Sequence, residues 1–201
     1  MKLHWSPKSP FVRKVMIAAH ELDMLPRIEL VRSVAAMREP NPAIMADNPL
    51  SKIPTLVLPD GPALFDSAVI CEYLDALADG SLFPRTGAAR WQALRWQALG
   101  DGLLDLLLLW RNERERDAPL AQLIAAFEVK ARATLQRLEA EAPELHSTPF
   151  AIGHLTLVCA LGYLDYRFDA FGWRSQAPDL ARWFQAMQQR PSVMATAPVD
   201  G

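Results

Sequence analysis

The hydrophobic periodicity of this 201-residue chain changes type once, near residue 84, and this change constrains the fold more than any other feature. Before it, short β-rich runs alternate with segments of helical spacing. After it, every long apolar segment repeats at helical spacing and none alternates as a strand does. These segments are residues 88–114, 120–142, 150–168 and 178–189. The chain is therefore predicted to form a small α/β domain followed by an all-α helical bundle domain.

The first part has the element order βαβ followed by ββα. Its β-rich runs predict strands at residues 2–6, 27–31, 55–58 and 63–65, and its helical spacing predicts helices at 10–22 and 67–77. A turn signal at 59–62 makes the last two strands a hairpin. Residues 34–53 are rich in proline and asparagine, which favours a loop with a short helix.

The linker between the two parts is predicted from composition. Residues 79–87 hold two glycines and a proline, which is typical of a connection rather than of a helix. The predicted domains are residues 1–78 and 88–201, joined by 79–87.

Composition excludes several classes of partner. The net charge is −2 and the arginines are scattered among acids, so no nucleic-acid partner is predicted. The most apolar run, 103–110, is interrupted by Asp105 and is too short to span a membrane. Cys71 and Cys159 lie in apolar runs and are interpreted as reduced core thiols, which favours a cytoplasmic protein. The four histidines lack ligand spacing, so no metal site is predicted.

Ser9 stands at the expected start of the first helix. Pro10 suits the first helical position, which makes Ser9 the natural N-cap. A side-chain oxygen there lies beside free backbone N–H groups and the positive end of the helix dipole, a place that favours an anion. Ser9 is therefore either a cap alone or a cap that also contacts a ligand.

Two further pairs lie where a ligand could meet the sheet. Pro54 precedes a strand and marks a boundary or a tight cis turn, which leaves the backbone of Ile53 open to an extended ligand. Asp66 can hold an ammonium group and Ser67, at a helix start, a carboxylate. Together these two groups form the end of an α-amino acid. The simpler alternative is that Pro54 ends a loop and that Asp66 or Ser67 only caps a helix.

Three motifs of the chain resemble the glutathione transferase family. They are Ser-Pro-Lys-Ser-Pro-Phe-Val-Arg-Lys-Val at 6–15, Asn-Pro-Leu-Ser-Lys-Ile-Pro-Thr-Leu at 48–56, and Leu-Phe-Asp-Ser-Ala-Val-Ile-Cys-Glu-Tyr-Leu at 64–74. The resemblance implies a thioredoxin-like N-terminal domain, an all-helical C-terminal domain and a homodimer. It also implies glutathione as the co-substrate and no metal.

The resemblance assigns a glutathione-binding role to five residues. Pro54 would follow a cis peptide bond, and Ile53 would bind the cysteinyl backbone of glutathione. Asp66 and Ser67 would hold its γ-glutamyl end, and Lys52 would lie near its glycyl end.

The resemblance makes Ser9 the catalytic residue of a serine-type enzyme. Its hydroxyl would contact the glutathione thiol, whose thiolate form is the nucleophile. No cysteine stands at this position, and Trp5 stands where many relatives have tyrosine, so the cysteine-type and tyrosine-type mechanisms are not favoured. Ser6 and backbone donors remain alternatives.

The family binds its electrophile between the two domains. By resemblance, the pocket residues would be Trp5, Ser6, Phe11, Leu107, Trp110 and Arg111. The alternative is that residues 103–110 are core or dimer face. Arg111 and Arg114 would favour an electrophile with an acid group, unless they only pair with Glu113 and Glu115.

The central helix of the second domain departs from the family pattern. Relatives open it with a Ser/Thr-x-x-Asp capping box, and here residues 151–154 read Ala-Ile-Gly-His. Both capping partners are predicted to be lost, with Thr148 and Pro149 as a substitute cap one turn earlier. We expect lower stability than in relatives that keep the box.

The predicted function is conjugation of the glutathione thiolate to small hydrophobic electrophiles. One alternative is another glutathione-dependent reaction, peroxidase or isomerase, on the same fold. The other is a non-catalytic glutathione-transferase-like binding module, since fold alone does not fix function.

Overall fold

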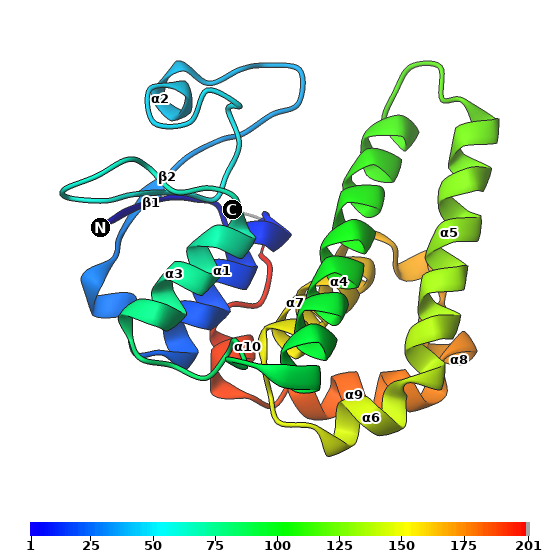
Figure 1. Ribbon diagram of the computed structural model, residues 1–201. Helices are drawn as coiled ribbons and strands as arrows, with labels where there is room; N and C mark the ends of the chain where they lie inside the picture. The colour runs from blue at the N-terminus through cyan, green and yellow to red at the C-terminus, as the bar shows by residue number, and fades with distance from the viewer. Residues whose placement is uncertain (200–201) are drawn as a thin grey trace.

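The computed structural model of the protein describes residues 1–199. A small sheet with its helices forms the first part and a helical domain forms the second (Figure 1). The predicted fold class is confirmed.

The sheet has three strands in the order β2–β1–β3. The central strand β1 (Lys2–Trp5) runs parallel to β2 (Glu29–Arg32) and antiparallel to β3 (Thr55–Val57). The predicted strand at 63–65 is reduced to a single bridge between Leu56 and Leu64, because the chain turns into a helix at residue 67. The second strand begins later than predicted, because Leu25–Arg27 form a 3-10 turn, η1.

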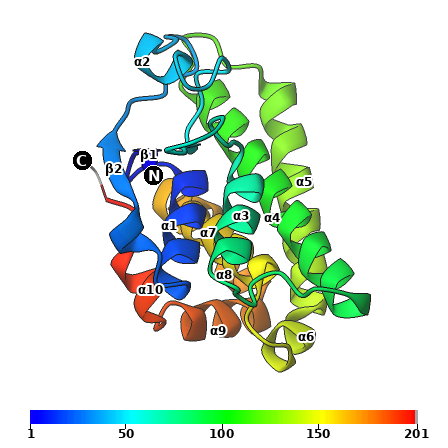
Figure 2. The ribbon, with the colours of Figure 1, turned by 60° about the vertical axis from the view of Figure 1, so that its left-hand side comes forward.

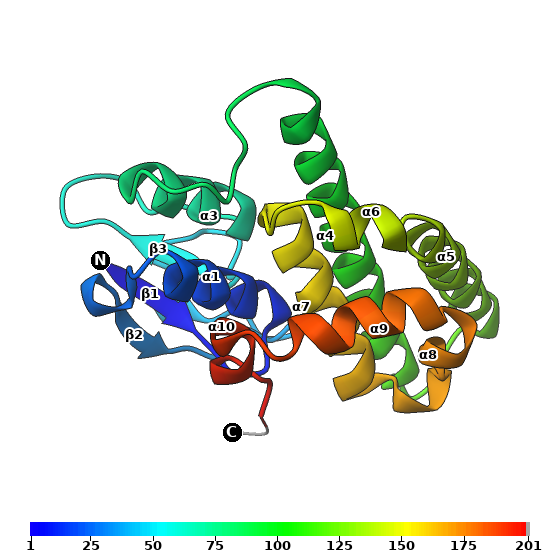
Figure 3. The ribbon, with the colours of Figure 1, turned by 90° about the horizontal axis from the view of Figure 1, so that it is seen from below.

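Three helices accompany this sheet. They are α1 (Pro10–Glu21), the short α2 (Pro42–Met45) and α3 (Ser67–Leu77). Figures 1 and 3 show α1 and α3 side by side. Since both helices begin at the end of a loop that leaves the sheet, their N-termini bring polar residues to the edge of this domain.

The second domain contains helices and 3-10 turns within residues 87–195. They are α4 (Gly87–Arg114), α5 (Ala121–Ala140), α6 (Ala142–Ser147), α7 (Ile152–Arg167), η2 (Asp169–Phe171), α8 (Trp173–Gln176), α9 (Pro178–Met187) and α10 (Pro191–Ala195). Within residues 1–199, no helix has the length and apolar character needed to cross a membrane.

Helix α7 is the centre of the molecule. Every residue from Ile152 to Leu164 is buried, and the helix packs against α4 on one side and α1 on the other (Figure 2). The approach to α4 depends on small residues: a Cβ on Gly153 would lie 2.7 Å from the Ala93 carbonyl oxygen, and one on Gly100 would lie 2.8 Å from the Thr156 methyl group.

Two ionic contacts join α1 to the second domain. Lys14 is fully buried, and its Nζ donates to both carboxylate oxygens of Asp101 in α4, at 2.8 and 2.7 Å. At the other end of α1, Glu21 accepts hydrogen bonds from Arg190 and Ser192. Figure 3 shows α10 returning to α1 at this end. The two domains are therefore fixed to each other through α1.

The start of α7 corrects two predictions. Thr148 and Pro149 are not a substitute N-cap, because Thr148 ends α6 and α7 begins at Ile152. One capping contact survives: the backbone N–H of Ala151 donates to Nδ1 of His154 at 3.2 Å. Only the contact that a side-chain oxygen at residue 151 would make is lost, because a methyl group cannot accept a hydrogen bond.

Candidate functional site

Ser9 forms the N-terminal cap of α1. Its backbone is extended, with φ −84° and ψ 118°, and its Oγ accepts a hydrogen bond from the Val12 N–H at 3.2 Å. Because the oxygen acts as acceptor in this bond, the hydroxyl proton remains available for donation to a ligand. The cap therefore leaves the Ser9 hydroxyl able to make the ligand contact that the sequence predicts, and the catalytic role stays a prediction.

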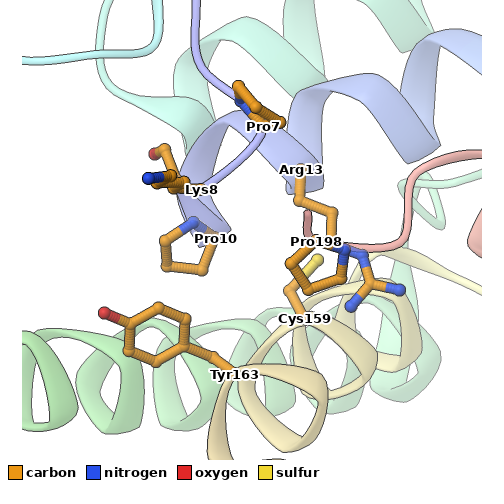
Figure 4. Close-up of a pocket in the computed structure, with 8 residues that line it drawn as sticks. Pro7, Lys8, Pro10, Arg13, Cys159, Tyr163 and Pro198 are labelled. Atoms are coloured by element: carbon orange, nitrogen blue, oxygen red, sulfur yellow. The ribbon is translucent and has the colours of Figure 1, made fainter. Parts of the chain in front are cut away.

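A small cavity adjoins Ser9 at the boundary between the domains. Its volume is about 10 Å³, roughly the space of one water molecule. The lining residues are Pro7, Lys8, Ser9, Pro10, Arg13, Cys159, Tyr163 and Pro198. Figure 4 shows Tyr163 and Cys159, both from α7, on the wall opposite Pro10. The cavity thus joins the start of α1 to the middle of α7.

Arg13 carries a positive charge into this wall. Its side chain is buried, its Nη2 donates to the Val193 carbonyl at 3.2 Å, and burial lowers its pKa from the usual range. Burial raises the pKa of the nearby Cys159 thiol to about 11. Cys159 is therefore a protonated, unreactive wall residue at neutral pH.

The loop before β3 holds Lys52, Ile53 and Pro54 in a fixed shape. The Ile53–Pro54 peptide bond is cis. Buried Asn48 donates to the Lys52 carbonyl at 3.3 Å and to Thr55 Oγ1 at 2.9 Å, and Thr55 donates to the same carbonyl. Ile53 is half-buried and the Lys52 side chain is exposed. Asn48 and Thr55 are positioning residues that sequence reasoning missed, because both look like ordinary loop and strand residues.

Asp66 and Ser67 lie at the start of α3. Asp66 is the N-cap: its Oδ1 accepts from the Ala68 N–H at 2.9 Å, and its side chain is exposed. Ser67 is buried at the first helical position. The Phe65–Asp66 peptide bond is also cis, which no sequence signal indicated because residue 66 is not proline. One carboxylate oxygen of Asp66 serves the helix, so the second can serve a ligand.

Charged groups surround this edge of the domain. Burial raises the pKa of Asp101 and of Asp105 in α4, although Lys14 acts against the shift at Asp101. Asp66 and Lys52 also influence the Asp105 carboxyl. The start of α3, the loop before β3 and the middle of α4 therefore share one electrostatic environment.

The six predicted electrophile-pocket residues fall into four places, and none of the six lines the Ser9 cavity. Trp5 and Ser6 meet Arg32, which lies over the Trp5 ring and donates to Ser6 Oγ at 3.0 Å. Phe11 is half-buried in α1. Leu107 and Trp110 belong to the helical core, where Trp110 packs on Phe168 and Phe171; Arg111 reaches the cavity only through Tyr163.

Tyr163 and Arg13 are cavity residues that the sequence did not indicate. Both lie in helices with continuous burial, so no exposed face marks them. Among residues 1–199, no cluster of histidine, cysteine, aspartate or glutamate is placed to hold a metal ion.

A helix cap, a cis-proline loop and an acidic helix start lie at one edge of a small α/β domain, beside a helical domain. This arrangement is that of the thioredoxin-like class with an added helical domain. Comparison with known families agrees. Residues 8–77 match the glutathione S-transferase N-terminal domain and residues 121–186 match its C-terminal domain. The chain belongs to the glutathione S-transferase family.

Three relatives illustrate the match. An uncharacterized GST-like protein of Escherichia coli, YibF, is 30% identical over 98% of each chain. The crystal structure of a glutathione transferase family member from Pseudomonas fluorescens Pf-5 with bound glutathione is 43% identical over 99% of each chain, with a TM-score of 0.95. A Pf-5 structure with bound S-(propanoic acid)-glutathione is 41% identical over the full length of both chains, with a TM-score of 0.90.

Proposed function

We propose that this protein is a glutathione transferase that conjugates the glutathione thiolate to small electrophiles, with Ser9 as the residue that stabilises the thiolate. The Ser9 hydroxyl carries the proposal, because its oxygen caps α1 as an acceptor and its proton is not needed for that cap. Glutathione bound to the Pf-5 relative supports a glutathione site here.

The chemistry follows from the pKa of the thiol. A free thiol has a pKa near 8.5, about 1.5 units above neutral pH, so most of it is protonated. Donation from Ser9 and the free N–H groups of α1 both favour the charged form. A downward shift of about 2 units, roughly 2.7 kcal/mol, would make the thiolate the dominant form.

Lys52, Ile53, Pro54, Asp66 and Ser67 are the proposed glutathione-binding residues. Asp66 keeps one carboxylate oxygen for the ammonium group of the γ-glutamyl end, and Ile53 offers its backbone beside the cis bond. Lys52 supplies an exposed cation for the glycyl carboxylate. The bound S-(propanoic acid)-glutathione of the second Pf-5 structure supports an adduct on sulfur as a ligand of this site.

One experiment tests the proposal. Glutathione affinity and the conjugation of an aryl halide are measured for the wild type and for Ser9→Ala. We expect both forms to bind glutathione and the variant to lose about 25-fold in turnover at pH 7, because the thiolate fraction falls by that factor when the thiol pKa returns from about 6.5 to about 8.5. Unchanged turnover would remove Ser9 from the mechanism. Absence of glutathione binding would favour the non-catalytic module, and turnover of a hydroperoxide in place of the aryl halide would favour the peroxidase.

The proposal includes a homodimer in the cytoplasm. Val69 in α3 is 47% exposed and Trp91 in α4 is 70% exposed. The Glu72–Arg90 ion pair, at 3.2 Å, holds these parts of the two helices together, so the two side chains supply apolar area for a second copy. The buried, unpaired Cys71 and Cys159 suit a reducing compartment. Light scattering of the wild type and Trp91→Glu tests the dimer, and a monomeric wild type would refute it.

A further inference from the structure

A tyrosine hydroxyl and an arginine guanidinium meet beside the Ser9 cavity. Tyr163 in α7 lines the cavity together with Ser9 and Pro10. Nη1 of Arg111 in α4 donates a hydrogen bond to the Tyr163 hydroxyl at 3.1 Å. Figure 4 places the hydroxyl at the end of the ring away from Cys159, on the side of Lys8 and Pro10. The pair thus stands across from the proposed position of the sulfur.

The proton of Tyr163 has no acceptor of its own. The hydroxyl oxygen already accepts from Arg111, and within residues 1–199 it makes no other hydrogen bond. Its proton is therefore available to a ligand, as is the proton of Ser9. Burial raises the pKa of Tyr163 above its usual value, so the phenol keeps this proton at neutral pH.

The charges around Tyr163 are mainly positive. Arg111 and Arg167 both act on its hydroxyl. The facing carboxylate is Glu115, which lies 3.6 Å from Arg111 Nε and is itself 63% exposed. Asp165, two residues from Tyr163, is occupied by Trp173 and Arg174, at 2.8 and 2.6 Å. A neutral, apolar ligand group would leave the Tyr163 hydroxyl proton without an acceptor, whereas an anionic group would accept it.

We propose that Arg111 and Tyr163 bind a carboxylate on the electrophile, so that the preferred substrates are short carboxylic acids with an electrophilic carbon. This inference rests on the proposed transferase function. With an α,β-unsaturated acid, a bond forms between the glutathione sulfur and the β-carbon while the carbon–carbon π bond breaks. The proton that left the thiol ends on the α-carbon, so the acid and glutathione supply every atom of the product.

Titration calorimetry with three ligands tests the assignment. Glutathione reports the glutathione site, S-propylglutathione adds an uncharged chain, and S-(2-carboxyethyl)glutathione adds a chain that ends in a carboxylate. We expect the wild type to bind the carboxyethyl compound at least 10-fold more tightly than the propyl compound, as a hydrogen-bonded charge pair implies. Arg111→Gln and Tyr163→Phe should each lose most of this preference and keep their affinity for glutathione.

Arg114→Gln is the matched control. Arg114 follows on the same helix, but its guanidinium stacks on Phe168 and donates to the Arg167 carbonyl, so the preference should survive its loss. If Arg111→Gln does not fold, Tyr163→Phe, which removes a single oxygen atom, decides the result. Equal affinity of the wild type for the two adducts, or an unchanged preference in both variants, would overturn the inference and leave the transferase function standing. If the wild type binds none of the three ligands, both proposals fail.

Discussion

The N-terminal N–H groups of α1 and of α7 find their hydrogen-bond partners in different ways. Both helices leave backbone N–H groups without helical partners, and both lie near the boundary between the domains. At α1, Ser9 caps the helix with a hydroxyl that keeps a proton for a ligand. At α7, residue 151 is alanine, and His154 accepts the Ala151 N–H while Leu82 accepts the Ile152 N–H at 2.8 Å.

The difference extends along the two helices. α1 carries Arg13 and Lys14 into the interface between the domains, whereas residues 152–164 of α7 are uncharged unless His154 takes up a proton. Charge in α1 is tolerable because the second domain supplies partners, Asp101 above all. A polar side chain therefore caps the helix that starts at the proposed ligand site, whereas neutral contacts form the start of α7.

The largest effect is expected from breaking the buried ion pair of α1. Lys14→Met leaves the Asp101 carboxylate without its partner, and we expect a loss of about 3 kcal/mol in the free energy of unfolding, the lower end for such pairs because Asp101 is partly exposed. Urea denaturation measures it. The double variant Lys14→Met, Asp101→Leu should recover most of the loss, since both charges are then gone. A single variant as stable as the wild type would show that the α1 interface does not depend on this charge.

The start of α7 predicts a loss of folding stability at low pH that is nearly as large as the loss expected for Lys14→Met. His154 accepts at Nδ1 from the Ala151 N–H, and its Nε2 lies 3.1 Å from Thr148 Oγ1, which itself donates to the Glu144 carbonyl. Burial, with Arg190 adding to it, lowers the His154 pKa to about 4. The unfolded chain binds the proton near pH 6.5 and the folded chain only near 4, so stability is full above 6.5 and falls as the pH drops through this window.

The free energy of unfolding is expected to fall by up to about 3 kcal/mol at pH 4 because of His154. His154→Asn is the control, because its amide oxygen can accept the Ala151 N–H without titrating. We expect urea midpoints of the wild type to fall more steeply between pH 6.5 and 4 than those of the variant. Parallel profiles would mean that His154 is protonated in the folded chain.

A third prediction separates the two roles of Ser9. Loss of an N-cap serine costs about 1 kcal/mol when alanine replaces it, and only a few tenths when glycine does. Ser9→Gly should therefore melt close to the wild type and Ser9→Ala below it, while both lose conjugation equally. A Ser9→Gly variant with wild-type turnover would show that the N–H groups of α1 stabilise the thiolate without the hydroxyl.

The same contrast explains what the sequence could reveal. Caps are local, so Ser9 and Asp66 could be placed at helix starts from their neighbours alone, and the structure places both there. The prediction for Pro54, before β3, also depended only on residues next to it in the chain. The two-domain order followed from the change in periodicity, which depends only on residues close in the chain.

The opposite wall of the cavity could not be predicted in this way. Tyr163 and Ser9, more than 150 positions apart in the chain, line the same cavity only because α7 packs on α1. Residues 106–109 are four consecutive leucines, so periodicity could not tell which face of α4 would meet α7. For that reason Leu107 and Trp110, expected at the pocket from the family resemblance, belong to the helical core.

The smallest effect is expected from restoring the missing half of the cap on α7. In Ala151→Ser, the new oxygen can accept from the backbone N–H of His154, a gain of about 0.5–1 kcal/mol that corresponds to a rise of about 1–4 °C in Tm. The gain stays at the lower end because residue 151 is 6% exposed, and a buried hydroxyl without a partner is unfavourable. Calorimetry of this variant beside Ala170→Ser, an exposed alanine in η2, separates capping from a general effect of serine. If the Tm of Ala151→Ser is equal to or below that of the wild type, packing of the alanine methyl group contributes more to stability here than a hydroxyl cap does. The hydrogen bonds to His154 and to the Leu82 carbonyl would then be sufficient to cap α7.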